Sequence, residues 1–258
     1  MLLSMDMNPV TVPVGRLTMD APWRWLGAGW RDLWTAPALS LGYGIAVTGG
    51  GALIIFALGR SGLAALIPMA FGIFAIVGPL LAVGLYEMSR RIEEGAKPAL
   101  FPIRFPGPRS PLQLAFVGIF ILLAAFIWVL VAMVLYSVFS AGIFLPPGDF
   151  VAFAISTPNG LIMTAVGTVM GGIIAFAIFL LTVVSIPMLM NERTDAFTAI
   201  AEGVKAFKSY PAVMALWAWL ICIVLVGGVA SFFVGLTLAF PLLGHATWHA
   251  YRDIRGRS

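Results

Sequence analysis

The sequence predicts an all-α integral membrane protein with six transmembrane helices, arranged as three parallel two-helix hairpins with amphipathic cytoplasmic interface helices. Of its 258 residues, 61% are hydrophobic and only 10% are charged, and the mean hydropathy is +1.02. A soluble core does not need so much apolar surface. Several apolar runs reach the roughly 20 residues that a helix needs to cross a hydrocarbon layer about 30 Å thick. No charge interrupts their middles, as spanning helices require.

The predicted spans form pairs along the chain. Their approximate ranges are 38–58, 63–86, 112–137, 161–190, 212–228 and 231–250. Only residues 59–62 separate the first two spans, which predicts a tight hairpin, whereas a soft connection rich in proline, residues 146–159, separates the third from the fourth. For the last pair an alternative stays open, because a re-entrant hairpin that returns to the same side fits the same residues.

The basic residues predict the orientation, since Lys and Arg accumulate in short cytoplasmic loops. With six spans, 14 of the 15 Lys and Arg residues fall on one side, and only Arg60 lies opposite. Both termini are therefore expected in the cytoplasm, with residues 1–20 as a flexible tail and 21–258 as a single membrane domain. No apolar run precedes Pro37, so no cleavable signal peptide is expected. The basic residues follow the membrane edges without a nucleic-acid-binding motif, so no nucleic acid partner is expected.

An internal repeat links the first and last hairpins. Residues 29–39 and 203–213 share, without a gap, the pattern Gly, basic, large apolar, hydroxyl, Pro, Ala, aliphatic. Pro37 and Pro211 then suit the first turn of a span, where the missing N–H would be unpaired anyway. The residues before each proline are amphipathic, and the tryptophans near Arg24 and Arg31 predict a helix at the level of the lipid headgroups.

The second, fourth and sixth spans also resemble one another, because each contains a proline followed by two apolar residues. These prolines are Pro79, Pro187 and Pro241. Since two-helix units keep one direction in the membrane, the simplest arrangement is three like-oriented hairpins around a pseudo-threefold axis. Each proline is expected to bend its helix by leaving a carbonyl one turn earlier without a donor. Such bends either open a cavity between spans or only adjust packing.

Four motifs carry a family resemblance. They are Gly29-Trp30-Arg31-Asp32, the segment 78–91, Ser185-Ile186-Pro187-Met188-Leu189 and the segment 241–249. Together they resemble a bacterial inner-membrane family catalogued as domain of unknown function 2189, over about residues 23–252. The resemblance implies a protein of the bacterial inner (plasma) membrane but supplies no activity. Members are sometimes labelled cytochrome c oxidase subunit I, a label that two histidines within one helical turn do not support.

Those histidines, His245 and His249, are the sharpest chemical feature. Their i, i+4 spacing places both rings on one helix face, a geometry that can chelate a transition metal or supply a haem ligand. The repeat places Glu87 at the position equivalent to His249, so a carboxylate could join them. The structural interpretation, in which the histidines cap helix ends, is favoured because the motif lacks a third ligand. The candidate polar cluster around the pair comprises Glu87, Tyr86, Trp248 and Arg252.

Three classes of function follow. The sequence favours a non-enzymatic scaffold or an accessory or assembly component of a membrane complex, surrounded by the lipid bilayer and bound to a membrane protein or to a second copy. No nucleophile elbow, phosphate-binding loop or metalloprotease helix is present, and no cofactor is expected. A transporter or channel for a small solute is the alternative, and it predicts a polar cavity between spans. A haem- or metal-handling protein that uses His245 and His249 is the third.

Overall fold

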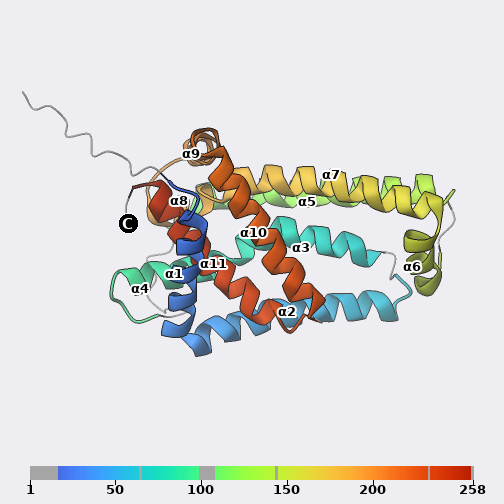
Figure 1. The fold of residues 1–258 in the computed structure, drawn as a ribbon, viewed down its shortest axis with the longest axis horizontal. Coiled ribbons are helices and arrows are strands. Elements are labelled where there is room, and N and C mark those ends of the chain that lie inside the picture. The colour runs from blue at the N-terminus through green and yellow to red at the C-terminus, as the bar shows by residue number, and fades with distance from the viewer. Residues whose placement is uncertain (1–16, 64–65, 99–107, 143–144, 232, 257–258) are drawn as a thin grey trace, which may run out of the picture.

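The structure is a computed structural model that describes residues 17–63, 66–98, 108–142, 145–231 and 233–256. All regular secondary structure within these ranges is helical, which confirms the all-α prediction (Figure 1). The helices are α1 (Ala21–Thr35), α2 (Pro37–Arg60), α3 (Ile67–Leu81), α4 (Val83–Glu93), α5 (Pro111–Phe139), α6 (Pro147–Ser156), α7 (Pro158–Thr182), α8 (Ser185–Asn191), α9 (Ala196–Ser209), α10 (Pro211–Ala230) and α11 (Leu236–Ile254).

Five helical stretches are long and apolar enough to cross a membrane, and they correspond to the first five predicted spans. They are Pro37–Arg60, Ile67–Glu93, Pro111–Phe139, Pro158–Asn191 and Pro211–Ala230. The sixth predicted span corresponds to α11, which is not one of these five. The first half of α11 is apolar, but its second half carries His245, His249, Arg252 and Asp253.

The long helices α2, α3, α5 and α7 run along the long axis of the molecule, whereas α1 lies across it (Figure 1). At one end, called the polar end below, α1, α4, α8 and α9 surround the second half of α11, and α6 lies at the opposite end. The turn between α10 and α11 lies short of the far ends of α2 and α7 (Figure 1). Phe233 in this turn stacks on Phe71, with ring centroids 5.8 Å apart.

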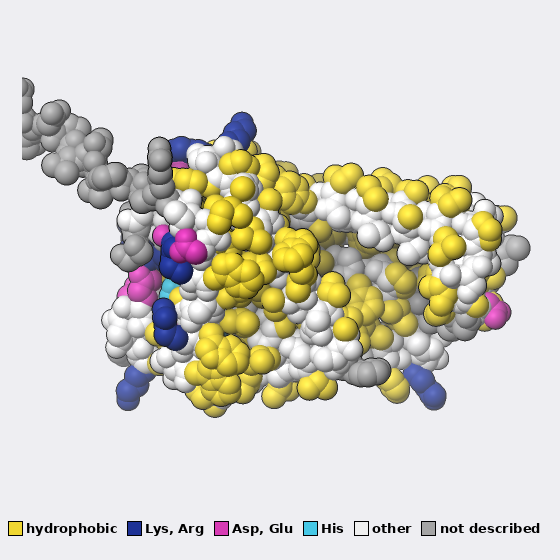
Figure 2. Space-filling view, in the orientation of Figure 1, with side chains coloured by type: hydrophobic (Ala, Val, Ile, Leu, Met, Phe, Trp, Pro, Cys, Tyr) yellow, Lys and Arg dark blue, Asp and Glu magenta, His cyan; other side chains and the backbone are white. Residues whose placement is uncertain are grey.

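Charged and apolar side chains are separated along the long axis. Figure 2 shows most of the visible Lys, Arg, Asp and Glu side chains at the polar end, while the middle of that face is largely apolar. Large apolar side chains in the spans point outward, among them Leu53, Phe126 and Ile173, which are 67%, 59% and 65% exposed. Such a surface is compatible with hydrocarbon but not with water. The chain is therefore an integral membrane protein with several apolar helices.

Three spans begin with the same backbone geometry. Pro37, Pro111 and Pro211 stand at the start of α2, α5 and α10. The residues before them have φ and ψ of −136° and 60° (Ala36), −131° and 67° (Ser110), and −136° and 57° (Tyr210). A residue before proline is kept out of the helical region by the proline ring, so each preceding segment must stop and turn there. All three spans were predicted to begin one residue later, but a proline start was predicted only for Pro37 and Pro211.

The helices that precede α2 and α10 dock through glycine. A Cβ on Gly29 of α1 would lie 2.6 Å from the backbone N of Ala246 in α11. A Cβ on Gly203 of α9 would lie 2.6 Å from the carbonyl O of Leu180 in α7. Both glycines are the first residue of the repeated pattern. The pattern thus combines a glycine at a close helix contact with a proline at the start of the next helix.

The three repeated prolines occupy different local settings. Pro79 lies two residues before the end of α3, where the chain breaks before α4, and Pro187 lies in the first turn of α8. Pro241 lies within α11 and leaves the carbonyl of Thr237 without its usual donor. Gly44 of α2 packs directly against this point, since a Cβ there would lie 2.1 Å from that carbonyl oxygen and 2.9 Å from Pro241 Cγ.

The connection between the third and fourth spans is more ordered than predicted. Instead of only a soft link, it contains the ten-residue helix α6. Thr157 joins α6 to α7, because its Oγ1 donates to the carbonyl of Phe153 at 2.8 Å and accepts from the N–H of Gly160 at 3.0 Å. The hydroxyl thus lies at the end of α6 and caps the start of α7. The proline-rich composition of this connection did not predict that role.

Candidate functional site

The buried centre of the polar end is His245 of α11, whose side chain is fully enclosed. Its Nδ1 lies 2.7 Å from Ser89 Oγ of α4, and its Nε2 lies 3.0 Å from Ser40 Oγ of α2. One imidazole therefore links three helices. Both serines are also completely buried, so these hydrogen bonds replace the water that the hydroxyls would otherwise bind.

The His245 ring is neutral in this environment. Burial lowers the pKa of His245 to about 4, with Asp32 opposing the shift and His249 adding to it. A neutral imidazole has one N–H donor and one acceptor nitrogen. One serine hydroxyl therefore accepts from the ring and the other donates to it, so both sides of the ring are satisfied.

His249, one turn further along α11, has a different partner. Its Nε2 lies 2.8 Å from Asp32 Oδ2 of α1, and Asp32 is itself buried. Asp32 closes the Gly-Trp-Arg-Asp motif that contributed to the family resemblance, but the sequence assigned it no partner. Its contact is 217 positions away in sequence, so only the folded chain brings the pair together.

The two histidines thus serve separate hydrogen-bonding arrangements. Within the described residues, no group of three or more His, Cys, Asp or Glu side chains is placed to hold a metal ion. A metal at His245 would have to displace a serine hydroxyl from a ring nitrogen. The carboxylate that bonds to His249 is Asp32, whereas Glu87 bonds elsewhere.

Glu87 is the buried carboxylate of an ion-pair network on α4. It accepts hydrogen bonds from Nε and Nη2 of Arg90 at 2.9 and 2.8 Å, and from Nε of Arg91 at 2.8 Å. Arg90 is also buried and reaches Glu94 at 3.0 Å. These pairs all lie within one helix, at i,i+3 and i,i+4 spacing. A buried charge of this kind is tolerated only when it is paired and hydrogen-bonded.

Trp248 and Arg252 of the predicted polar cluster both meet Glu93 of α4. Trp248 Nε1 donates to Glu93 Oε2 at 2.9 Å, and Arg252 forms an ion pair with the same carboxylate. On the α1 side, Trp25 Nε1 donates to Asp253 Oδ2 at 2.8 Å. These contacts bind the last turns of α11 to α4 on one side and to α1 on the other.

A further set of contacts, which the sequence did not reveal, connects α11 to α8 and α9. The Tyr251 hydroxyl donates to Glu192 at 2.7 Å and accepts from Asn191 at 3.1 Å. Arg255 bridges Glu192 and Glu202 at 3.1 and 3.3 Å. Glu192 lies three residues after the motif Ser185–Leu189. Its local sequence does not indicate a hydrogen bond to Tyr251, which lies 59 positions later.

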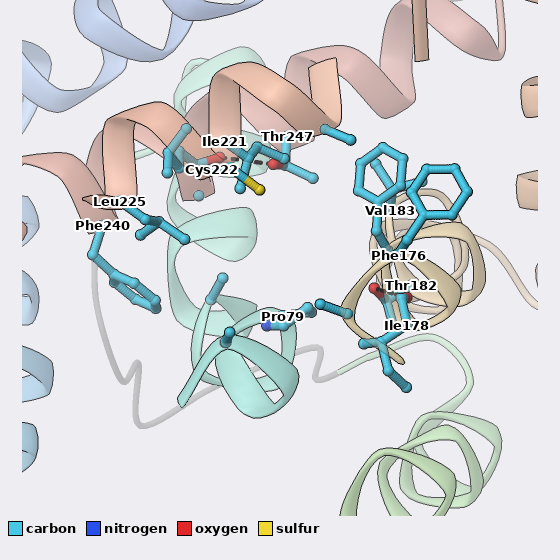
Figure 3. A pocket seen from close by; sticks show the side chains of 18 of the residues that line it. Pro79, Phe176, Ile178, Thr182, Val183, Ile221, Cys222, Leu225, Phe240 and Thr247 are labelled. Carbon is cyan, nitrogen blue, oxygen red and sulfur yellow. Dashed lines mark hydrogen bonds between the residues drawn. The ribbon is translucent and has the colours of Figure 1, made fainter. Parts of the chain in front are cut away.

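Beside the polar end, a cavity of about 390 Å³ lies between α3, α7, α10 and α11 (Figure 3). Its walls are mainly apolar, and no charged side chain is among the described residues that line it. Thr182 and Thr247 lie on the wall, but their hydroxyls donate to the carbonyls of Ile178 and Leu243 at 2.6 and 2.7 Å. Of the three repeated prolines, Pro79 lines the cavity and the others do not. The cavity between these four helices is therefore apolar, whereas the transporter hypothesis predicts a polar cavity between spans.

Comparison with known families supplies the remaining finding. Residues 66–191 match the family model DUF2189, described as a predicted integral membrane protein. The family recognised from the sequence motifs is thereby confirmed over this segment. No curated protein and no solved structure matches the chain. The DUF2189 segment extends from α3 to α8 and contributes Ser89 and Glu87, while His245 and Asp32 lie outside it.

Proposed function

We propose that the protein is a non-enzymatic accessory or assembly component of the bacterial inner membrane, with both termini in the cytoplasm. The observation that carries this proposal is the closed polar end. His245 bonds to serines of α2 and α4, and His249 bonds to Asp32 of α1, so these buried polar groups join α11 to three other helices. Glu87 is paired with two arginines of its own helix. An end whose helices are joined in this way suits a surface on which another membrane protein, or a second copy, assembles.

The architecture that goes with this proposal is three like-oriented hairpins, with α10 and α11 as the third. Support comes from the shared backbone geometry before Pro37, Pro111 and Pro211. Further support comes from Gly29 and Gly203, which occupy the same position in the repeated pattern and make equally close helix contacts. In this arrangement α11 crosses the hydrocarbon with its apolar half and reaches the cytoplasmic side with its histidines.

Purification from native membranes in mild detergent tests the accessory role. We expect either a second membrane protein at a fixed stoichiometry or a defined homo-oligomer, measured by mass spectrometry and by light scattering. A monodisperse monomer without a stoichiometric companion would contradict the proposal. Cysteine-labelling of the two termini in intact cells and in inverted vesicles tests the orientation independently.

A haem or metal role for His245 and His249 rests on their shared helix face. The same preparation decides it, because a bound haem gives a Soret absorption and a metal gives a stoichiometric signal in elemental analysis. Loss of either signal in the variant His249→Ala, with retention in a variant of the exposed Trp30, would establish the site. The absence of both signals from the wild-type protein would end that hypothesis.

A further inference from the structure

We propose that the cavity between α3, α7, α10 and α11 binds a neutral, carbonyl-bearing lipid that enters sideways from the bilayer. This inference goes beyond the accessory role and does not depend on it, since a lipid site requires no protein partner. The evidence concerns where the cavity opens, what its walls exclude and which polar group they leave without a partner.

The cavity opens toward the lipid-facing surface. Its walls include Phe176 of α7 and Trp219 of α10, which are 38% and 59% exposed. Figure 2 shows the visible face hollowed between these two helices. Both helices belong to stretches that are apolar enough to span the membrane, so the medium outside the opening is hydrocarbon. A molecule dissolved in the bilayer can therefore reach the cavity without crossing water.

The walls exclude charged ligands. No charged side chain lines the cavity in the described part of the chain, and both threonine hydroxyls on the wall already donate to carbonyls of their own helices. A charged group transferred here would lose its hydration without gaining a partner, which is strongly unfavourable. The occupant must therefore be neutral over the part that lies inside.

One polar group on the wall points to the chemistry of the ligand. Tyr86 of α4 lines the cavity and is only 3% exposed, and no hydrogen bond joins its hydroxyl to another group in the described part of the chain. The hydroxyl is not among the fully enclosed polar atoms that lack a partner, so a molecule in the cavity can reach it. A tyrosine hydroxyl in apolar surroundings normally finds a partner. A carbonyl oxygen on a bound lipid would accept this hydrogen bond, while the hydrocarbon part fills the apolar space.

The size of the cavity fits such an occupant. Protein interiors are packed as closely as organic crystals, with few voids larger than a water molecule. A cavity of about 390 Å³ lies instead within the roughly 300–1,000 Å³ typical of small-molecule sites. Figure 3 shows Pro79, Phe176 and Phe240 on different sides of the open space.

A photoreactive probe tests the proposal in lipid nanodiscs. The probe is 4-decylbenzophenone, which has one ketone oxygen, one alkyl chain and no charge. We expect saturable labelling of the full-length protein, with modified peptides from the cavity-facing sides of α3, α7, α10 and α11. Labelling that does not saturate and spreads over the lipid-facing residues of all spans would overturn the proposal.

Paired variants locate the site. Ala175→Phe places a ring on the cavity wall of α7 and should lower saturable labelling at least tenfold, whereas Ile173→Phe, on the lipid-facing side of the same helix, should leave it unchanged. Ala218→Phe blocks the opposite wall on α10 if Ala175→Phe does not fold. Equal labelling of the blocked and control variants would place the probe outside the cavity.

The variant Tyr86→Phe tests the hydrogen bond. Loss of one hydrogen bond of about 1 kcal/mol should raise the half-saturating probe concentration roughly fivefold. Unchanged labelling would show that Tyr86 does not donate a hydrogen bond to the probe, and the proposed carbonyl group would be wrong. Organic extracts of the protein purified without probe should contain a neutral carbonyl-bearing lipid enriched over the bulk membrane, and an extract of unchanged composition would count against it. None of these results depends on whether a protein partner copurifies.

Discussion

The polar end and the membrane cavity meet at α4 and α11 but differ in how their polar groups are paired. At the polar end, buried charges and imidazoles are paired, as Glu87 with Arg90 and His249 with Asp32 show. At Tyr86, the residue before Glu87, the cavity wall presents a hydroxyl without a hydrogen-bond partner in the described part of the chain, beside open space. The comparison indicates that the first region fixes the arrangement of the helices, which allows the second to remain open. Substitutions should therefore be costly in the first region and mild in the second.

The largest expected effect comes from Glu87→Ala. It leaves the buried Arg90 beside the exposed Glu94 and removes one partner of Arg91. Breaking a buried pair by removing one partner costs about 3–5 kcal/mol. We expect a corresponding loss of stability by thermal unfolding in detergent. The control is Glu94→Ala, whose side chain is 51% exposed and which should cost less than about 1 kcal/mol. Equal losses for both variants would show that burial at Glu87 does not matter.

The second effect is a dependence of stability on pH through His245. Its pKa is lowered to about 4 in the folded protein, against an ordinary value of 6.5. The unfolded chain therefore binds a proton that the folded one does not, and stability should fall as pH decreases from about 6.5 to 4. The full loss is on the order of 3 kcal/mol. Midpoints of unfolding measured across this range should fall less steeply in His245→Gln, and an identical slope in both proteins would refute the assignment.

The third effect concerns two glycines of α2. Gly44→Ala would place a methyl group 2.1 Å from the carbonyl oxygen of Thr237, so α2 and α11 must separate, at a cost of about 1–3 kcal/mol. Gly49→Ala meets nothing within 4 Å on the same helix. This control should be neutral or slightly stabilising, by up to about 1 kcal/mol, because alanine favours the helix. Destabilisation by Gly49→Ala alone would place the close contact elsewhere on α2.

These expectations also separate what the sequence could predict from what it could not. Hydropathy and proline positions located α2, α5 and α10 to within a few residues, because both signals are local. The partners of the histidines were not predictable, since Ser40 and Ser89 lie 205 and 156 positions from His245. The cavity likewise depends on how far α7 and α10 stand apart, a property of packing that composition does not encode.

The smallest expected effect comes from Cys222→Ala on the cavity wall. Cys222 is the only cysteine of the chain, it is exposed, and it lines the cavity. Because its surroundings are already open, removing the sulfur creates little new cavity surface, and the change should stay within about 0.5 kcal/mol. Thermal unfolding beside Met214→Ala, a fully buried residue of the same helix, provides the contrast, since that truncation should cost about 2–5 kcal/mol. If Cys222→Ala were as destabilising as Met214→Ala, the wall would be packed rather than open, and the distinction between the closed polar end and the open cavity would fail.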